Sequence, residues 1–497
     1  MPEVTEMRSG ALNCWRNHFV PSTSSPALSA PKPLSFPVNP APTALKQFAF
    51  TLQSESYRYR TPMKFGGRVV EEVTVLTAEC TATNQAGQVA DGDKIGVGSM
   101  TMGVTWAWPD AALSDAAKLE VVMELASRMA AQANELSGTL TGHPMEICLQ
   151  LASRRDELVE AVASGHELTS PIPELAILLA ASPIEAALFD AHGKAAGQSS
   201  YRLLSAEHLP PDLAEMTGDD RYAGLRLDQF ISQAPVATLP LYHLVGALDP
   251  LTEAELTKPV GDGLPETLGE WITRNELTHL KIKLNGDDAD WDFRRVRDIN
   301  AVANETTDRG ASTGKPWWFS LDFNERCKDE AYVLGLLDRL ESECPEAFER
   351  IQYIEQPTHR DLKRPGAVTM HQAAARIPVV IDESLTGLES LHLAVSQGYS
   401  GIALKACKGH AEALLLGAVA VHENLFLCVQ DLTCVGASLL HSASLSAHIP
   451  GVAAVESNGR QYCPEGNAEW MAKFGPMFEV RGGSVPTSCL DGPGLGY

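Results

Sequence analysis

Short apolar runs that alternate with helical segments over residues 238–460 constrain the fold more than any other feature. Each run has the length of a β-strand, and the segments between them carry apolar residues at helical i, i+3 and i+4 spacing. Eight strand–helix alternations predict a (β/α)8 TIM barrel, an α/β fold. A doubly wound sheet is the alternative, but no glycine-rich nucleotide loop follows the first run. The runs are LPLYHLVGA, HLKIKLNG, WWFSLDFNE, RIQYIEQP, IPVVIDES, SGIALKAC, LFLCVQDL and GVAAVESNG.

The chain outside the barrel divides into parts of different composition. Residues 1–45 contain a stretch rich in Pro, Ser and Ala, which predicts an extended or flexible arm. Residues 46–205 show strand signals followed by helical segments, which indicates an α+β domain. Within it, Ser182, Pro183 and Glu185 predict a helix start with a capping box. Residues 206–237 form a polar connecting insert, and residues 461–497 form a C-terminal tail.

The charge balance disfavours some classes of partner. With 39 Lys and Arg against 63 Asp and Glu, the net charge is −24, so neither nucleic acid nor an anionic membrane surface is expected. No apolar run approaches the ~20 residues of a membrane span, and the first residues lack a signal-peptide core. Ten cysteines without a CxxC motif predict reduced thiols in a cytoplasmic protein.

Charged residues gather at the carboxyl ends of five successive runs, where the active site of a (β/α)8 barrel lies. Lys281 and Lys283 are two residues apart, so both side chains point to the same face of one strand. The next three runs end in carboxylates, and the run after them ends in lysines. These residues are Asp322 with Asn324, Glu355, Asp382 with Glu383, and Lys405 with Lys408.

This pattern indicates a divalent cation and proton transfer. Carboxylates that converge on one mouth repel each other, and their hard oxygen atoms suit Mg²⁺. A carboxylate substrate that chelates the metal would present its α-carbon between the two groups of lysines. One lysine, with its pKa lowered by nearby positive charge, could remove the α-proton. The metal would stabilise the enediolate, and the other lysine could return a proton on the opposite face.

These motifs resemble the mandelate racemase/muconate lactonising enzyme group of the enolase superfamily, over roughly residues 48–460. The similarity rests on SPIEAALFDAHGK, the KxK pair, the DxN, EQP and DES strand ends, and the later lysine. It implies one Mg²⁺ bound by Asp322, Glu355 and Asp382. It also implies that Lys283 and Lys405 are the acid/base groups, with Lys281 as an auxiliary lysine.

The same resemblance implies that residues 46–205 cap the barrel mouth as a lid, and that the C-terminal tail packs back toward it. Loops at 64–69 and 99–108 would then lie over the substrate. Trp106 and Trp108 could instead be lid packing, and Asn324 and Glu383 could support the metal ligands. The candidate substrate-binding residues are Phe65, Trp106, Asn324, Gln430, Asp431 and Glu456.

Two departures from the family pattern bear on the mechanism. His410 stands where the family has a glycine, and it is interpreted as a helix-start residue. The run ending in Gln430 lacks the histidine of the mandelate racemase type, and His441 follows in a helical segment. The two-lysine arrangement of the muconate lactonising type is therefore preferred.

The sequence thus predicts an isomerase, either a racemase/epimerase or a cycloisomerase, that acts on a small carboxylate. A dehydratase or related lyase of the same superfamily is the alternative. A Schiff-base aldolase and a barrel that only binds a ligand are less favoured, because neither needs three carboxylates together with the lysines. Barrels of this kind commonly associate, so a homo-oligomer is expected.

Overall fold

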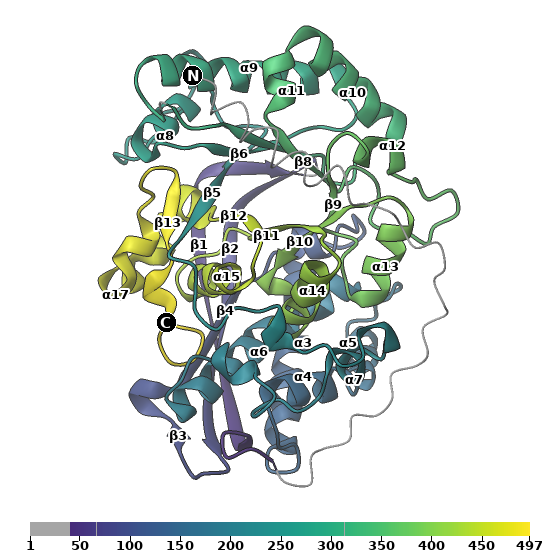
Figure 1. The fold of residues 1–497 in the computed structure, drawn as a ribbon, viewed down its shortest axis with the longest axis vertical. Helices are drawn as coiled ribbons and strands as arrows, with labels where there is room; N and C mark the ends of the chain where they lie inside the picture. Colours follow the sequence, from purple (N-terminus) through teal and green to yellow (C-terminus); the bar gives the residue numbers. More distant parts are fainter. Residues whose placement is uncertain (1–39, 66, 313) are drawn as a thin grey trace.

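The computed structural model describes residues 40–65, 67–312 and 314–497. Most of the predicted N-terminal arm therefore lies outside the described residues. Figure 1 shows the long strands β1 and β2 (purple) running from the lid helices to the barrel, with helices α8 to α14 around the barrel strands. The predicted architecture, an α/β barrel with a β-rich N-terminal cap, is confirmed.

The lid contains a four-stranded antiparallel sheet in which β2 pairs with each of the other strands. Phe48, Phe50 and Leu76 on its inner face are buried. The first strand is absent from the sequence-based prediction, because its outer half, LQSESYRYR, is polar on both faces. The strands are β1 (Leu45–Phe65), β2 (Arg68–Asn84), β3 (Val89–Ala90) and β4 (Gly96–Thr101).

Five helices follow these strands, and the predicted helix start at Ser182 is wrong. Helix α6 begins at Glu174 and continues through Pro183. Proline has no N–H to donate to the carbonyl of Leu179, and the Ser182 hydroxyl donates to that carbonyl instead, at 2.9 Å. The helices are α2 (Val104–Ala107), α3 (Asp115–Leu136), α4 (Pro144–Ala152), α5 (Asp156–Gly165) and α6 (Glu174–Ala196).

Strand β4 packs directly on the backbone of α6 because two of its residues are glycines. A Cβ atom at Gly96 would lie 2.4 Å from the Ala187 carbonyl oxygen, and one at Gly98 would lie 2.0 Å from the Pro183 carbonyl oxygen. No side chain fits at either position. The lid sheet and its central helix are therefore locked at a fixed separation.

Helix α6 has the length and apolar composition of a membrane-crossing helix, although polar residues interrupt its apolar sequence. Its most apolar 18-residue window is 89% buried inside the fold. It packs against the lid sheet on one side and helices of the lid on the other. Its apolar character is thus accounted for by its position as the core helix of the lid.

Eight parallel strands form the barrel, and it closes where β12 pairs with β5. Each strand coincides with one of the eight apolar runs of the sequence. The strands are β5 (Thr238–Val245), β6 (His279–Lys283), β7 (Trp318–Asp322), β8 (Ile351–Glu355), β9 (Val379–Ile381), β10 (Gly401–Lys405), β11 (Phe426–Gln430) and β12 (Val452–Glu456).

The helices between these strands cover the outside of the barrel (Figure 1). Three of them begin with a side-chain cap, in which Thr267, Asp288 and Asp329 accept backbone N–H groups at the starts of α8, α9 and α10. The helices are α8 (Leu268–Asn275), α9 (Ala289–Asp308), α10 (Glu330–Glu343), α11 (Pro345–Glu349), α12 (His371–Ala374), α13 (Leu388–Ser396), α14 (His410–His422) and α15 (Ala437–His448).

Strand β6 shows how the barrel sorts its side chains. Leu280 and Ile282 belong to the apolar layer between strands and helices. The His279 ring packs instead on Tyr242 inside the barrel, with ring centroids 5.4 Å apart. Because side chains alternate along a strand, Lys281 and Lys283 share the inner face with His279. The two lysines of the KxK motif therefore point toward the barrel axis and its mouth.

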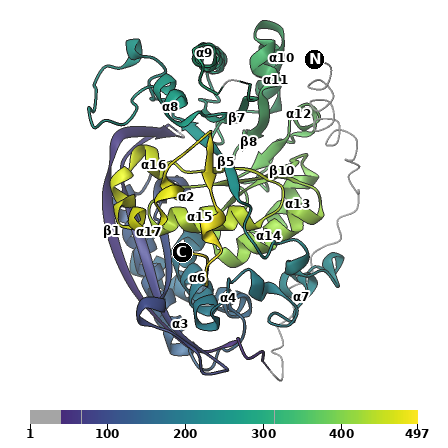
Figure 2. The ribbon, with the colours of Figure 1, turned by 60° about the vertical axis from the view of Figure 1, so that its left-hand side comes forward.

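The last part of the chain returns to both the barrel and the lid. Strand β13 (Ser484–Pro486) pairs antiparallel with β5, and the Leu495 N–H donates to the Asp190 carboxylate on α6 at 2.8 Å. Figure 2 shows α16 (Gly459–Tyr462) and α17 (Ala468–Phe478) near the long strand β1, and the Tyr462 and Tyr59 rings stack at 5.8 Å. The lid is thus built from segments at both ends of the described chain.

Candidate active site

The charged residues predicted at the strand ends meet at one mouth of the barrel. Lys283 and Asp322 are direct partners in the pairing of β6 with β7, and Asp322 and Glu355 are partners in the pairing of β7 with β8. Asp382 follows the last residue of β9, and Lys405 is the last residue of β10. Parallel strands bring their carboxyl ends to one edge, so adjacent runs deliver adjacent side chains.

The two lysines of β6 bind carboxylates from three other strands. The Lys281 ammonium lies 2.9 Å from a Glu355 oxygen, 3.2 Å from an Asp322 oxygen and 3.4 Å from a Glu456 oxygen. Lys283 forms an ion pair with Asp322. Lys281 is 2% exposed and Lys283 is 9% exposed. A buried network of opposite charges therefore crosses the mouth from β6 to β12.

A second group of opposite charges lies across the mouth, around Asp382. The Lys405 ammonium donates to one Asp382 carboxylate oxygen at 2.6 Å. Lys408, in the turn after β10, reaches the other oxygen at 3.2 Å and the Asp382 backbone carbonyl at 2.5 Å. Strands β6 and β10 are four apart in the closed barrel, so Lys283 and Lys405 approach the mouth from opposite sides.

The ends of β11 and β12 support this arrangement. Gln430 donates its amide to Glu355 and to the Tyr353 hydroxyl, and it does not line the cavity described below. Asp431 accepts the backbone N–H groups of Thr433 and Asn458, at 3.1 and 2.8 Å. The acids at these two strand ends are therefore already hydrogen-bonded within the chain.

Carboxylates control the charge of the site lysines. Burial opposes the charged form of Lys281, but Glu355 and Glu456 outweigh burial and raise its pKa well above the usual value. Burial likewise opposes the charged form of Lys405, and Asp382 raises its pKa. Each of these two lysines faces a carboxylate at hydrogen-bond distance, which favours its charged form.

Among the metal-ligand candidates, burial and crowding act most strongly on Glu355. Burial and the nearby Asp322 carboxylate raise its pKa well above the usual value. Burial acts in the same direction on Asp382, but Lys405 and Lys408 outweigh it and hold its pKa at about 2. Repulsion between the Asp322 and Glu355 carboxylates, together with burial, thus outweighs the attraction of Lys281 for Glu355.

The same residues are chemically suited to Mg²⁺. In the described part of the chain, no three His, Cys, Asp or Glu side chains are gathered in metal-binding geometry, because ammonium groups bind the carboxylates. Three buried acceptor oxygens beside them, however, have no hydrogen-bond partner; they belong to Asn324, Glu383 and Gln430. Unpartnered buried acceptors among crowded carboxylates suit a hard cation that prefers oxygen ligands.

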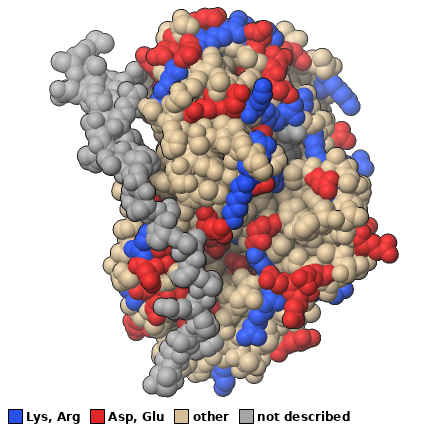
Figure 3. Space-filling model, turned by 90° about the vertical axis from the view of Figure 1, so that its right-hand side faces the viewer, with Lys and Arg blue, Asp and Glu red and all other residues tan. Residues whose placement is uncertain are grey.

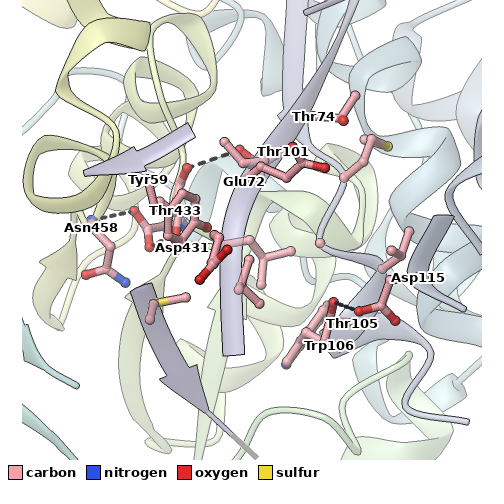
Figure 4. A pocket seen from close by; sticks show the side chains of 18 of the residues that line it. Tyr59, Glu72, Thr74, Thr101, Thr105, Trp106, Asp115, Asp431, Thr433 and Asn458 are labelled. Carbon is pink, nitrogen blue, oxygen red and sulfur yellow. Dashed lines mark hydrogen bonds between the residues drawn. The ribbon is translucent and has the colours of Figure 1, made fainter. Parts of the chain in front are cut away.

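A cavity of about 340 Å³ lies between this site and the lid. Its floor includes Lys281, Lys283, Lys405 and Asn324. Figure 4 shows Asp431, Thr433 and Tyr59 grouped on one side, with Trp106, Thr105 and Asp115 on another. The remaining wall is largely aliphatic, formed by Met63, Val69, Val70, Val73, Met102, Val104, Leu119, Leu244 and Leu432. The lid therefore covers the charged floor with a mixed lining, in which Glu71, Glu72 and Asp115 stand among the aliphatic side chains.

The two predicted lid loops both reach the cavity region. Trp106 is 5% exposed and lines the cavity, whereas Trp108 is buried away from it. In the loop at 64–69, Val69 lines the cavity, and Lys64 and Gly67 line a second cavity of about 260 Å³ that also contains Lys283. The Phe65 side chain and Gly66 lie outside the described residues.

Sequence reasoning missed several residues of the site. Tyr59 lies on a strand that the prediction lacked, and Arg360 lies in the loop after β8. Arg360 forms an ion pair with Glu325 and donates to the Trp106 carbonyl at 3.1 Å. No local sequence signal marks such contacts, because each joins segments that are far apart in the chain.

Both unexpected histidines are structural. His410 is the first residue of α14, as predicted, and His441 lies inside α15. Their rings bond to each other at 2.9 Å, and both residues are fully buried. Burial lowers the pKa of His441 to about 4. Neither histidine lines the cavity over the strand ends.

Comparison with known proteins places this architecture in a class. Residues 264–497 match the family model "Enolase C-terminal domain-like". No curated protein matches the sequence. Among solved structures, the dipeptide epimerase from Enterococcus faecalis V583, complexed with Mg and the dipeptide L-Leu-L-Tyr, has a TM-score of 0.56 at 16% identity, over 91% of this chain and 99% of that one.

Two further structures show the same fold. The N-succinyl Arg/Lys racemase from Bacillus cereus ATCC 14579 has a TM-score of 0.57 at 15% identity, over 90% of this chain and 95% of that one. The 2-chloromuconate cycloisomerase from Rhodococcus opacus 1CP has a TM-score of 0.54 at 16% identity, over 91% of this chain and 96% of that one. At these identities the likeness is one of fold.

The fold and the strand-end site define a lidded α/β barrel with a charged mouth. Residues 264–497 match the enolase C-terminal domain-like family model. The lid and the barrel together share the fold of the solved epimerase, racemase and cycloisomerase structures.

Proposed function

We propose that this protein is a Mg²⁺-dependent isomerase that moves the α-proton of a carboxylate substrate, as a racemase or epimerase. One observation carries the proposal. Lys283 and Lys405 come from strands four apart in the closed barrel and line the same cavity. Two such groups on opposite sides of one carbon atom can remove a proton from one face and return one to the other.

The carboxylates between the lysines have a matching role. Bound by Asp322, Glu355 and Asp382, Mg²⁺ would supply the positive charge that stabilises an enediolate. Lys283 and Lys405 would then be released from their carboxylate partners and could exchange protons with the substrate α-carbon. Lys281, which contacts three carboxylates, would hold them in place and would attract the substrate carboxylate.

The lid supplies the remaining requirement, a protected reaction space. Its aliphatic side chains would limit the access of water to the α-carbon, which would strengthen the charge interactions on the floor. A cycloisomerase fits the same site if only one lysine exchanges a proton, and a solved relative is named as such. The number of faces from which the α-proton exchanges therefore separates the two reactions.

The test is deuterium exchange. The protein is incubated with Mg²⁺ in heavy water together with single enantiomers of mandelate, dipeptides and N-succinyl amino acids, and deuterium at Cα is followed by NMR. We expect exchange with one of these acids and its loss on adding a chelator. Lys283→Ala and Lys405→Ala should each abolish exchange starting from one enantiomer.

Lys363→Ala provides the matched control, since Lys363 is an exposed lysine paired only at the surface with Glu389. It should exchange at the wild-type rate from both enantiomers. Full activity in both Lys283→Ala and Lys405→Ala would contradict the mechanism. Borohydride trapping of a substrate on either lysine, with activity surviving the chelator, would instead support the Schiff-base alternative.

We also propose a cytoplasmic location and a homo-oligomeric state. The described cysteines are all free, and most are buried, which suits a reducing compartment. On the face drawn in Figure 3, acidic and basic side chains are interspersed, as on surfaces that do not bind nucleic acid. Size-exclusion chromatography with light scattering measures the oligomeric state directly.

A further inference from the structure

One lid residue, Trp106, contacts the loops after three successive barrel strands. Its indole N–H donates to Glu383, after β9, at 3.2 Å. Its backbone carbonyl accepts from Arg360, after β8, at 3.1 Å. Its ring faces the ammonium of Lys405, at the end of β10, with the nitrogen 4.4 Å from the ring centroid. Apolar packing alone does not require three directed contacts of this kind.

The segment that carries Trp106 is also held on the lid side. The hydroxyl of its neighbour Thr105 donates to Asp115 at the start of α3, at 2.8 Å. Asp115 in turn binds Arg68 on β2 and Lys118 on α3. Figure 4 shows Trp106 beside Thr105 and Asp115 at the pocket edge. The indole is therefore fixed from both the lid and the barrel.

We propose that Trp106 is a positioning residue for Lys405, an inference that rests on the proposed function. The Lys405 ammonium has two partners on different sides, the Asp382 carboxylate at 2.6 Å and the indole face. A carboxylate attracts the ammonium but also competes for its proton. An aromatic face attracts the cation through its quadrupole and accepts no proton, and tryptophan does so most strongly.

The position of the indole has a consequence for the reaction. When the Asp382 carboxylate binds another group, the Trp106 indole face still contacts the end of the flexible Lys405 side chain. It also accommodates the neutral amine, because the face is apolar. Lys405 then keeps its place beside the cavity. Lys283 has no such aromatic partner among the described contacts, so only one face of the substrate depends on Trp106.

The experiment compares Trp106→Phe, which keeps an aromatic face, with Trp106→Met, which has a flexible apolar side chain and no aromatic face. Carbamylation by cyanate, followed by peptide mass spectrometry, measures the reactivity of each lysine without any substrate. In Trp106→Met we expect Lys405 to react on the order of ten-fold faster, because the cation–π contact is lost. The reactivity of Lys283 should stay within about two-fold, and Trp106→Phe should lie near the wild type.

Deuterium exchange is the second readout. In Trp106→Met, exchange from the Lys405 face should fall on the order of ten-fold, while exchange from the Lys283 face is retained. Trp108→Phe is the matched control, because Trp108 lies in the same segment but does not line the cavity; it should change neither readout. Circular dichroism verifies that each variant is folded.

Unchanged Lys405 reactivity in folded Trp106→Met, or an equal loss of exchange from both faces, would overturn the proposal. If Trp106→Met does not fold, Arg360→Met releases the Trp106 carbonyl without touching Lys405 and should change its reactivity in the same direction. If no acid is turned over by the wild type, the proposed function fails, and the carbamylation result still decides whether Trp106 positions Lys405.

Discussion

Replacing Lys281 by methionine tests the charge network of the barrel mouth most directly. Methionine fills the same elongated space, so the change removes the charge with little loss of packing. Three carboxylates, those of Glu355, Asp322 and Glu456, then lose an ammonium that lies 2.9, 3.2 and 3.4 Å from them. All three are almost completely buried, so water cannot replace the missing partner.

The size of the effect follows from this burial. Removing one partner of a buried ion pair destabilises a protein by about 3–5 kcal/mol, because the remaining charge is uncompensated. Lys281 serves three carboxylates, so we expect the upper part of that range, limited by proton uptake at Glu355. Since ~1 kcal/mol shifts the melting temperature by about 2–4 °C in domains of 150–250 residues, the loss should be on the order of 10 °C.

Thermal unfolding followed by circular dichroism, with and without Mg²⁺, measures the change. Mg²⁺ stabilises the folded form by mass action, by about 2.7 kcal/mol at a concentration 100 times its Kd. The variant offers an uncompensated oxygen site, so Mg²⁺ should raise its melting temperature more than that of the wild type. The metal would thus recover part of the stability that the substitution removes.

Lys118→Met is the matched control. Lys118 is a fully buried lysine of the lid, but it pairs only with Asp115, which is half exposed. We expect Lys118→Met to lower the melting temperature less than Lys281→Met does, and to respond to Mg²⁺ as the wild type does. A loss below about 1 kcal/mol in Lys281→Met, the value typical of an exposed ion pair, would refute the reasoning. An equal rise in melting temperature with Mg²⁺ in the wild type, Lys281→Met and Lys118→Met would refute the assignment of the metal to these carboxylates.

Two further predictions concern the lid. Burial raises the pKa of Glu185 to about 7, so ionisation of this carboxyl opposes folding, and the free energy of unfolding falls as pH rises from about 4.5 to 7. In urea unfolding, Glu185→Gln should have the wild-type free energy of unfolding at pH 4.5 and exceed it by up to about 3 kcal/mol at pH 8. A difference between the two proteins that does not change with pH would contradict the shift. Gly98→Ala should lower the free energy of unfolding by about 3 kcal/mol or more, because the added Cβ meets the Pro183 carbonyl oxygen. Gly335→Ala is the control: the added Cβ meets open space, so the free energy of unfolding should stay the same or rise.

The barrel and its charged mouth could be predicted because their information is local. Each apolar run specifies a strand, and the residue after it falls at the same edge as its neighbours. Asp322 and Glu355 were therefore predicted to approach each other from their positions in the sequence alone. The partner of each lysine could not be predicted in this way, because the choice of carboxylate depends on side-chain conformation.

The lid was less predictable because its structure depends on distant partners. Pro183 indicated a helix start by local rules, but buried packing on both sides carries α6 through it. Glu185 was predicted to cap its own helix, and it instead accepts the Ala411 N–H, 226 residues later, at the start of α14. Trp106 could be identified as a cavity residue, but its contacts with Glu383 and Arg360 required the structure.

The bond from Leu495 to Asp190 spans 305 residues, and this has a consequence for folding. Contacts between positions so distant in sequence form slowly, because a long loop must close before they are gained. During synthesis the lid helix emerges well before the segment that covers it. The lid strands and helices that bury α6 precede it in the chain, but Asp190 gains the Leu495 N–H only after the barrel strands have been made. This edge of the lid is therefore the last part to be completed.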